Sequence, residues 1–533
     1  MRFPYQKTLA LVLGLSIVCL SGCAAADKTS AVFTQAAQTA QVSQTAETVT
    51  TADAVKLTFS DTAVSGSGAG VEIDGTHVSI SKAGTYVLSG SCADGSVTVK
   101  KGTTGVTLVL EDLSLTASDR GAIACNKGTQ VTIQVNGTCA LADGEQNNDE
   151  NYPDNQNAEN AVIKCKDGSR VVLCGAGTLN IQANGKNGIK SGATTADGEA
   201  SLTIRELTLN IDAPVNDAVN AEAALEVESG VLTLSAGDDA LHCDYTLNIG
   251  AEGTDGPNVT ITTCNEGLEG AAVNVFSGNV SIQSTDDCIN AANADLTDFA
   301  YALNIYSGTI AARSDSGDGF DSNGDLTISG GHVTVWTANA ADNEPLDADG
   351  TVTVSGGTVL AAGGSSGMGM NLSASQPCVI FGGDTAGRLG GHTPSEQPNG
   401  NGQPDGSQQP NGETRPARGG FSGGASLLTQ GSAFTVADSN GAALYTGEAV
   451  YNASFVFFSS GDLSEGESYT LSSGETQTES AARTGTVSIG VGGQKLDGAP
   501  PSGGGGGQRP EGDTPRSKSE GENIPNNGSD AKA

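Results

Sequence analysis

The sequence has few aromatic residues and few basic ones. Aromatics make up 4% of the 533 residues, and 25 Lys and Arg stand against 61 Asp and Glu, which gives a formal net charge of −36. The proportions of an ordinary globular domain do not apply to this chain. Nucleic acids and anionic lipid surfaces recruit clusters of Lys and Arg, so the charge argues against both as partners. It favours cations, neutral glycans, or acidic glycans bridged by cations.

The N-terminus lacks an apolar run long enough to span a bilayer comfortably. Arg2 and Lys7 precede an apolar run from Leu9 to Leu20, which is typical of a signal peptide. The run ends in Leu20-Ser21-Gly22-Cys23, which resembles the lipobox of bacterial lipoproteins. This resemblance implies a lipoprotein signal peptide at 1–22, cleavage before Cys23 and a lipid on the Cys23 sulfur. We therefore expect a protein on the extracellular face of the bacterial cell membrane, held there only by its lipid; the alternative is an uncleaved anchor.

The cysteines include no CxxC pair. Cys19 lies in the signal peptide and Cys23 is the lipid site, which leaves nine of the 11 cysteines at irregular spacing. This spacing argues against a zinc site. An odd number in an exported protein leaves at least one thiol unpaired, and whether Cys125 and Cys165 form a disulfide stays open.

Glycine is abundant, at 75 residues, and it punctuates a repeat. From about residue 200 an apolar-x-apolar triplet, a Gly-containing turn, a second triplet and an acidic corner recur, as in Leu225-Glu226-Val227 followed by Leu232-Thr233-Leu234. Alternation with period two and β-branched residues indicates short strands. Each triplet buries only two side chains, so no repeat is able to fold alone.

Stacking the repeats would bury a continuous apolar column while each strand pairs with the rungs above and below it. Each repeat also has a third apolar position in its corner, at intervals of about 22 residues lengthened by loop insertions: Ile163, Ile189, Val219, Leu241, Leu268, Ile289, Phe320 and Leu346. Three inward faces per repeat favour a β-helix over a meander of hairpins. The sequence therefore predicts an all-β fold, a right-handed parallel β-helix (solenoid) with a small β C-terminal cap.

Composition divides the rest of the chain. A flexible stalk is expected at 23–55, the β-helix at 56–390, a Gly-, Pro-, Asn- and Gln-rich disordered insertion at 391–424, the β cap at 425–489 and a disordered tail at 490–533. The more aromatic cap would cover a sheet edge that otherwise invites aggregation. We expect a monomer.

The corners carry columns of polar residues. Two positions before the apolar corner residue stand Asn187, Asp217, Asp239, Glu266, Asp287, Asp318 and Glu344. One position after it stand Lys164, Lys190, Asn220, His242, Glu269, Asn290, Asp321 and Asp347. A third column, three positions before, holds Asn216, Asp238, Asn265, Asp286 and Asn343.

Stacked acids of one column would repel one another, because adjacent rungs are about 4.8 Å apart. Calcium takes six to eight oxygen ligands at about 2.3 to 2.6 Å, so a cation between two rungs would contact carboxylates of both. The sequence therefore predicts calcium ligands among Asp217, Asp239, Glu266, Asp287, Asp318, Asp321, Glu344 and Asp347. The alternative is that Asp and Asn occupy turns and bond nearby backbone groups.

The corner motifs Asn216-Asp217-Ala218-Val219 and Gly317-Asp318-Gly319-Phe320-Asp321, with their Ser-Gly-Gly turns, resemble the carbohydrate-binding β-helix proteins of clostridia. Ala83-Gly84-Thr85-Tyr86-Val87-Leu88-Ser89-Gly90 and Phe457-Phe458-Ser459-Ser460-Gly461-Asp462-Leu463 extend the resemblance, which spans roughly 56–385 and 425–475. It implies a pectate-lyase-like fold, calcium on corner aspartates, export to the cell surface, and binding of cellulose or polygalacturonate-like acidic glycans. The insertion at 391–424 departs from the compact pattern of that family.

Three functions remain open: a calcium-binding glycan-binding protein, which the sequence favours, a calcium-dependent pectate lyase, and a structural or adhesive surface protein. A lyase needs a base beside calcium, and Lys164, Lys190, His242 and Arg313 are the candidates. The lysines are more simply counter-charges, and His242 a corner residue satisfied by Asp239. Sugar rings would find a stacking surface on Phe276, Tyr306 and Trp336.

Overall fold

The computed structural model describes residues 51–194, 199–296, 299–338, 343–364, 370–382 and 426–489. The predicted signal peptide, Cys23, the stalk up to residue 50, the insertion at 391–424 and the tail at 490–533 lie outside these residues. Every named element of the described ranges is a β-strand. Within those ranges no helix has the length and apolar character that a membrane crossing requires.

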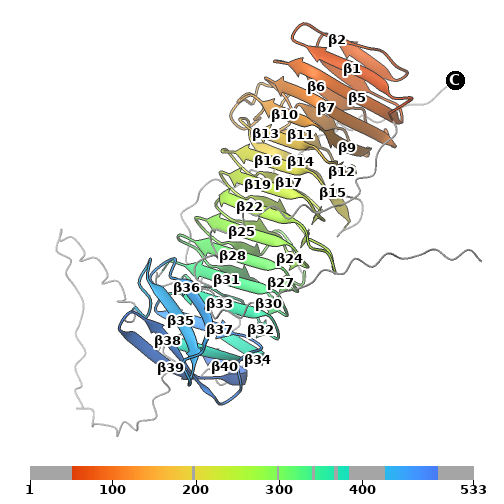
Figure 1. Cartoon of the computed structure of the whole chain (residues 1–533). Coiled ribbons are helices and arrows are strands. Elements are labelled where there is room, and N and C mark those ends of the chain that lie inside the picture. Colours follow the sequence, from red (N-terminus) through yellow and green to blue (C-terminus); the bar gives the residue numbers. More distant parts are fainter. Residues whose placement is uncertain are drawn as a thin grey trace, which may run out of the picture. The chain divides into compact units, whose positions relative to one another are not determined.

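Parallel strands stack rung upon rung, from the red end to the blue-green end of the chain in Figure 1. The first face is a column of register-paired strands: β9 (Gln130–Asn136), β12 (Arg170–Cys174), β15 (Ala200–Ile204), β18 (Ala224–Val227), β21 (Thr246–Ile249), β24 (Ala272–Val275), β27 (Ala302–Ile305), β30 (Asp325–Ile328) and β32 (Val352–Val354).

The second face has the same construction. It comprises β10 (Thr138–Asp143), β13 (Thr178–Gln182), β16 (Thr208–Ala213), β19 (Val231–Ala236), β22 (Asn258–Thr263), β25 (Asn279–Ser284), β28 (Thr309–Ser314), β31 (His332–Thr337) and β33 (Thr358–Gly363). Both faces continue into β7 (Val106–Ala117), which pairs with β9 through its first half and with β10 through its second.

The third face is the corner sheet. Its parallel strands are β4 (His77–Ile80), β6 (Ser96–Val99), β8 (Ile123–Cys125), β11 (Ala161–Cys165), β14 (Asn187–Ser191), β17 (Val219–Ala221), β20 (Leu241–Cys243), β23 (Leu268–Glu269), β26 (Ile289–Ala291) and β29 (Phe320–Ser322). Three parallel faces per turn confirm the predicted parallel β-helix.

The inward positions of the three faces form one continuous core. Leu225, Leu247 and Val273 stack along the first face and Val219 and Leu241 along the corner sheet, all with no exposed surface. Alternation places the next residue of each strand outward, where polar groups meet water. Cys125 and Cys165 are register partners inside this core, and both are buried free thiols.

Both ends of the stack are closed by strands that run against the parallel direction. At the first end β2 (Ala63–Ser65) pairs antiparallel with β1 (Val55–Ser60), which is parallel to β5 (Gly84–Cys92), and β3 (Val71–Asp74) pairs antiparallel with β4. At the other end β37 (Phe455–Ser459) is antiparallel to β33 and to β34 (Met370–Gly382), which also pairs with β40 (Arg483–Ile489).

A separate antiparallel sheet completes the C-terminal cap. Its order is β36 (Ala443–Glu448), β35 (Ala433–Asp438), β38 (Ser468–Ser473) and β39 (Thr476–Ala481). A second apolar cluster, which includes Trp336, Phe434 and Phe458, joins this sheet to the last rungs. The predicted β cap is confirmed, and it satisfies strand edges that would otherwise be open.

Candidate functional site

The corner register matches the alignment that the sequence predicts. Ile163 pairs with Ile189, and the pairing continues through Val219, Leu241, Leu268, Ile289 and Phe320. An isolated bridge from Phe320 to Leu346 adds the last corner. Because the apolar residues are in register, the polar residues two before them and one after them also line up, and we call these lines the inner column and the outer column.

Carboxylates of the inner column accept hydrogen bonds from backbone N–H groups of the next rung. The Asp239 N–H donates to Asp217 Oδ1 at 3.2 Å, and the Asp318 N–H donates to Asp287 Oδ1 at 2.7 Å. The Glu344 N–H donates to Asp318 Oδ1 at 2.5 Å. One oxygen of these carboxylates therefore caps the next rung, as the turn interpretation of the corner acids predicts.

The outer column contacts the inner one across the corner. Asn220 Nδ2 donates to Asp217 Oδ2 at 2.6 Å, and Asn290 Nδ2 donates to Glu266 Oε2 at 3.0 Å. The second oxygen of Asp217 and one oxygen of Glu266 thus point toward the outer column. The corner sheet has two halves that differ in their outer column: His242 and Glu269 stand in the half around β20 and β23, and Asn290 and Asp321 stand in the half around β26 and β29.

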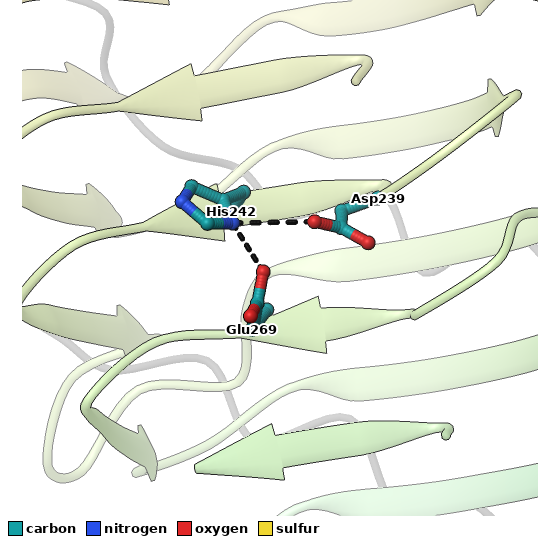
Figure 2. Close-up of side chains that lie close together, drawn as sticks. All are labelled: Asp239, His242 and Glu269. Atoms are coloured by element: carbon teal, nitrogen blue, oxygen red, sulfur yellow. Dashed lines mark hydrogen bonds and ion pairs between the residues drawn. The ribbon is translucent and has the colours of Figure 1, made fainter. Parts of the chain in front are cut away.

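The histidine cluster consists of Asp239, His242 and Glu269 on β20, β23 and the turn before β20. His242 Nδ1 lies 3.2 Å from Asp239 Oδ2 and also contacts Glu269 Oε2, and Figure 2 shows both carboxylates pointing at the ring. His242 Nε2 lies 3.4 Å from Asp244 Oδ1. The oxygens of Asp217, Asp238 and Asp239 come within 4.8 Å of one another beside it.

The pKa values of all three groups of the histidine cluster are shifted from their ordinary values. Burial opposes a charged ring, but hydrogen bonds to Asp239, Asp244 and Glu269 outweigh it and hold the pKa of His242 well above its ordinary value. Burial likewise opposes a charged Glu269, yet the contact with His242 lowers the pKa of that carboxyl. Burial raises the pKa of Asp239 to about 9. Burial thus favours the neutral form of Asp239, whereas the contacts between His242 and its acidic neighbours favour the charged forms of the ring and of Glu269.

The acid cluster, Asp318, Asp321 and Asp347 with Asn290 on the preceding rung, has no such base. Burial, followed by the charges of Asp287, Asp347 and Asp321, raises the pKa of Asp318 to about 8. Burial and then the charge of Asp347 raise the pKa of Asp321 to about 6. Within the described ranges no Lys, Arg or His lies within ion-pair distance of these three carboxylates.

Asn290, which stands beside the acid cluster, has a buried side-chain oxygen without a hydrogen-bond partner among the described residues. Asn290, whose amide donates to Glu266, leaves its Oδ1 buried and without a hydrogen bond from any described residue. Asn290 is the register partner of Asp321. Buried carbonyl oxygens are rarely left unsatisfied, and carbonyl and carboxylate oxygens together are the donor set of a hard cation. The donor types therefore suit calcium, although the groups of three ligand atoms that lie within 4.8 Å of one another among the described residues are in the histidine half: Asp239, His242 and Glu269, and Asp217, Asp238 and Asp239.

The predicted ligands are only partly brought together. Asp217 and Asp239 meet in the histidine half, and Asp287, Asp318 and Glu344 are joined by backbone hydrogen bonds. Glu266 lies between the halves, where burial and then the charge of Glu269 raise its pKa to about 8. The predicted ligand set omitted Asp238, His242, Glu269 and Asn290, although the sequence alignment had identified the columns in which they stand.

The two lysines of the outer column lie outside both clusters. Lys190 Nζ pairs with Glu222 Oε1 at 3.3 Å, and among the ion pairs of the described residues none joins either lysine to Asp217 or Asp239. Burial and then the charge of Lys190 lower the pKa of Lys164. Lys190 therefore pairs with Glu222, which lies outside the predicted acidic column, and the predicted role of the two lysines as counter-charges for that column is not seen among the described residues.

The predicted aromatic surface is smaller than expected. Phe276 and Tyr306 stack with ring centroids 4.9 Å apart and planes 3° apart, and Tyr306 is 45% exposed. Trp336 does not extend this surface, because its side chain is 1% exposed and packs edge-on against Phe434 of the cap. Inclusion of Trp336 among the sugar-contacting residues was therefore wrong: the cap, which is distant in sequence, covers it.

The sequence of this protein matches a known protein family. Residues 74–369, more than half of the chain, match the family described as carbohydrate-binding domain-containing protein. The chain belongs to this family. The matched region of this carbohydrate-binding domain family member contains every predicted calcium ligand and all of the second face up to Gly363.

Comparisons with solved structures and with curated proteins say less about this protein than the family match does. The polysaccharide lyase-like protein from C. thermocellum, determined as a gadolinium derivative, is 20% identical, with a TM-score of 0.30, and the match covers 59% of this chain and 96% of that one. No curated protein matches the chain.

Proposed function

We propose that this protein is a calcium-binding, glycan-binding protein of the cell surface that holds acidic polysaccharide, such as polygalacturonate, through calcium at the acid cluster. The observation that carries the proposal is the buried Asn290 Oδ1, on the rung beside Asp321, which has no hydrogen-bond partner among the described residues. Asp318, Asp321 and Asp347 likewise have no cationic partner within the described part of the chain. The matched family is one of carbohydrate-binding domains, which favours a glycan partner.

The acid cluster would supply oxygens from two or three rungs to one cation. Asn290 would offer its carbonyl oxygen, and Asp318, Asp321 and Asp347 their carboxylates. Bound calcium would neutralise carboxylates that now repel one another, and its remaining coordination positions accept uronate oxygens. Oxygen ligands at irregular positions suit calcium better than magnesium, which requires a near-ideal octahedron.

The net charge of −36 makes the cation necessary. A polyuronate approaching the bare corner meets like charge, so retention of the glycan without calcium is not expected. Exposed charges are screened by salt, and binding through calcium should therefore weaken as ionic strength rises. A neutral glucan would show neither dependence.

Binding is favoured over lyase chemistry because, among the described residues, none of the candidate bases lies within ion-pair distance of Asp318, Asp321 or Asp347, and Arg313, on β28, donates instead to Gln283 Oε1. Lys190 is on β14 and Asp321 on β29, five rungs apart in the corner sheet, which is about 24 Å at the spacing of paired strands. His242 is three rungs from Asp321, about 14 Å, and its ring is engaged by Asp239 and Glu269. A general base needs hydrogen-bond reach of its proton.

The decisive experiment is retention of polygalacturonate on immobilised protein. We expect retention in calcium, loss in EGTA, and loss in calcium for Asp318→Ala combined with Asp321→Ala. The matched control is Glu252→Ala combined with Asp255→Ala, which removes the same charge from an exposed loop and should bind normally. Retention that EGTA does not change would refute calcium bridging, and calcium-dependent stabilisation without any glycan binding would select the adhesive or structural role.

Membrane attachment through Cys23 is a separate part of the proposal, carried by the Leu20-Ser21-Gly22-Cys23 motif alone. Cys23→Ala should leave the precursor unprocessed or release the protein from the membrane fraction. Unchanged processing and partitioning of that variant would count against the lipid anchor.

A further inference from the structure

Two carboxylate oxygens of the histidine cluster lie against one ring nitrogen. Asp239 Oδ2 is 3.2 Å from His242 Nδ1, and Oε2 of Glu269, the register partner on the next rung, contacts the same nitrogen (Figure 2). A ring nitrogen carries at most one proton, and a linear hydrogen bond directs that proton at one acceptor. One proton therefore accounts for one of the two contacts, whereas a metal ion among the three atoms would bind all of them.

The separation of these atoms suits a small transition-metal ion. One ligand atom each from Asp239, His242 and Glu269 lies within 4.8 Å of the other two. Zinc binds imidazole nitrogen and carboxylate oxygen at about 2.0 to 2.2 Å, which places two tetrahedral ligands about 3.3 Å apart. The 3.2 Å between Asp239 Oδ2 and His242 Nδ1 matches that separation. The longer side chain of Glu269 would withdraw slightly to admit the ion.

The second ring nitrogen of His242 faces a further carboxylate. His242 Nε2 lies 3.4 Å from Asp244 Oδ1, and Asp244 is not one of the three converging ligands. A histidine that binds a metal through one nitrogen commonly donates its other N–H to a carboxylate, which fixes the ring and its tautomer. Asp244 is therefore placed as a positioning residue, and Nδ1 is the nitrogen left for the metal.

The donor set differs from that of the acid cluster. It combines one imidazole nitrogen with two carboxylate oxygens, whereas calcium takes oxygen ligands and imidazole suits zinc, nickel, copper and iron. Asp217, on the preceding rung, is engaged elsewhere, since its Oδ1 accepts the Asp239 N–H and its Oδ2 accepts the Asn220 amide. The side chains of His242 and Glu269 are 22% and 19% exposed, so an ion can enter from solvent and keep a coordination position for water.

We propose that Asp239, His242 and Glu269 form a site for a divalent transition-metal ion of the zinc type, with Asp244 orienting the imidazole. In the metal-free protein the ring proton takes the place of the ion. The site goes beyond the proposed glycan binding, which depends on calcium at the acid cluster. Two of its three ligands stand in the outer column, and the nitrogen ligand separates its preference from that of corner aspartates for calcium.

The test is calorimetric titration of the full-length protein with zinc chloride, after removal of metals with EGTA and in buffer that contains excess calcium. One zinc ion should bind per chain, and the calcium should not displace it. His242→Gln should weaken zinc binding by about 100-fold or more, and Asp244→Asn by about tenfold, since residues that only orient a ligand change metal affinity by about 10- to 100-fold. Unaltered circular dichroism of each variant shows that it is folded.

His332→Gln is the matched control, because it removes an exposed imidazole from β31 of the second face and should leave zinc binding unchanged. X-ray absorption of the zinc-loaded wild type gives a measurement that needs no variant, and it should show one imidazole among the nearest ligands. Absence of zinc binding by the wild type, displacement of zinc by calcium, or a shell of oxygen alone would overturn the inference. Asp318→Ala combined with Asp321→Ala should keep zinc binding, so failure here is separable from failure of the calcium site.

Discussion

The two halves of the corner sheet solve the same electrostatic problem in different ways. Around β20 and β23 the buried carboxylates surround His242, whose imidazolium is an internal counter-charge. Around β26 and β29 the corresponding carboxylates have Asn290 and one another as neighbours, and burial raises their pKa values. The comparison teaches that stacked acids have a counter-charge from the chain in one half, whereas among the described residues no side-chain cation contacts the acids of the other half.

The largest expected effect is that of calcium on the acid cluster. A ligand at 100 times its Kd stabilises the native state by about 2.7 kcal/mol, so chelation should lower the Tm of the wild type clearly. Asp318→Asn with Asp321→Asn should melt at the same temperature with and without calcium, and above the wild type in EGTA because the repulsion is gone. Thermal unfolding with both buffers checks this. An unchanged Tm of the wild type on chelation would contradict the prediction that calcium stabilises the acid cluster.

The next largest effect is expected in the histidine cluster. His242→Gln removes the counter-charge of Glu269 and should destabilise the protein by about 2 kcal/mol in EGTA, less than for a fully buried pair because the side chain of His242 is 22% exposed. Calcium should restore part of this loss, since the variant half then resembles the acid cluster. Unfolding in denaturant measures both values. A loss that calcium does not restore would show that the halves differ in more than their cation.

A pH series sharpens the comparison further. Asp318 and Asp321, with pKa values raised from 3.8 to about 8 and about 6, favour the protonated, folded state. Their contribution to stability is therefore fully present below about pH 4 and is lost as the pH rises through 6 to 8. In EGTA the Tm should fall over this range, and stabilisation by calcium should grow over it, because calcium binds the deprotonated carboxylates. In the Asp318→Asn, Asp321→Asn variant the fall in Tm should be smaller, because only Asp239 and Glu266, among the described carboxyl groups, then keep strongly raised pKa values, and the growth of calcium stabilisation should be absent.

The smallest effect is expected outside both halves. Lys190→Ala breaks a partly exposed pair with Glu222 and should cost about 0.5 kcal/mol, with calcium stabilisation and polygalacturonate retention unchanged. Incubation of polygalacturonate with the wild type or with the variant should produce no ultraviolet absorbance from unsaturated products. Absorbance that rises with the wild type and stops with Lys190→Ala would identify a lyase.

Sequence periodicity determined the fold of this protein. An apolar residue at every second position of a triplet, with a third apolar residue in each corner, has one arrangement that buries all of them, which is stacking in register. The corner alignment on Ile189, Val219 and Leu241 was therefore confirmed residue by residue. The same alignment located both polar columns, because their offset from the buried residue is fixed by the local chain.

Only the tertiary structure decided which polar residues share a proton, a hydrogen bond or a surface. Asp239 and Glu269 are both acids of the corner, yet burial raises the pKa of Asp239, whereas the contact with His242 outweighs burial and lowers the pKa of Glu269. Trp336 is buried by Phe434, which lies almost 100 residues further along the chain. Side-chain contacts of this kind depend on distances across rungs and between segments, and these distances arise only when the whole stack has formed.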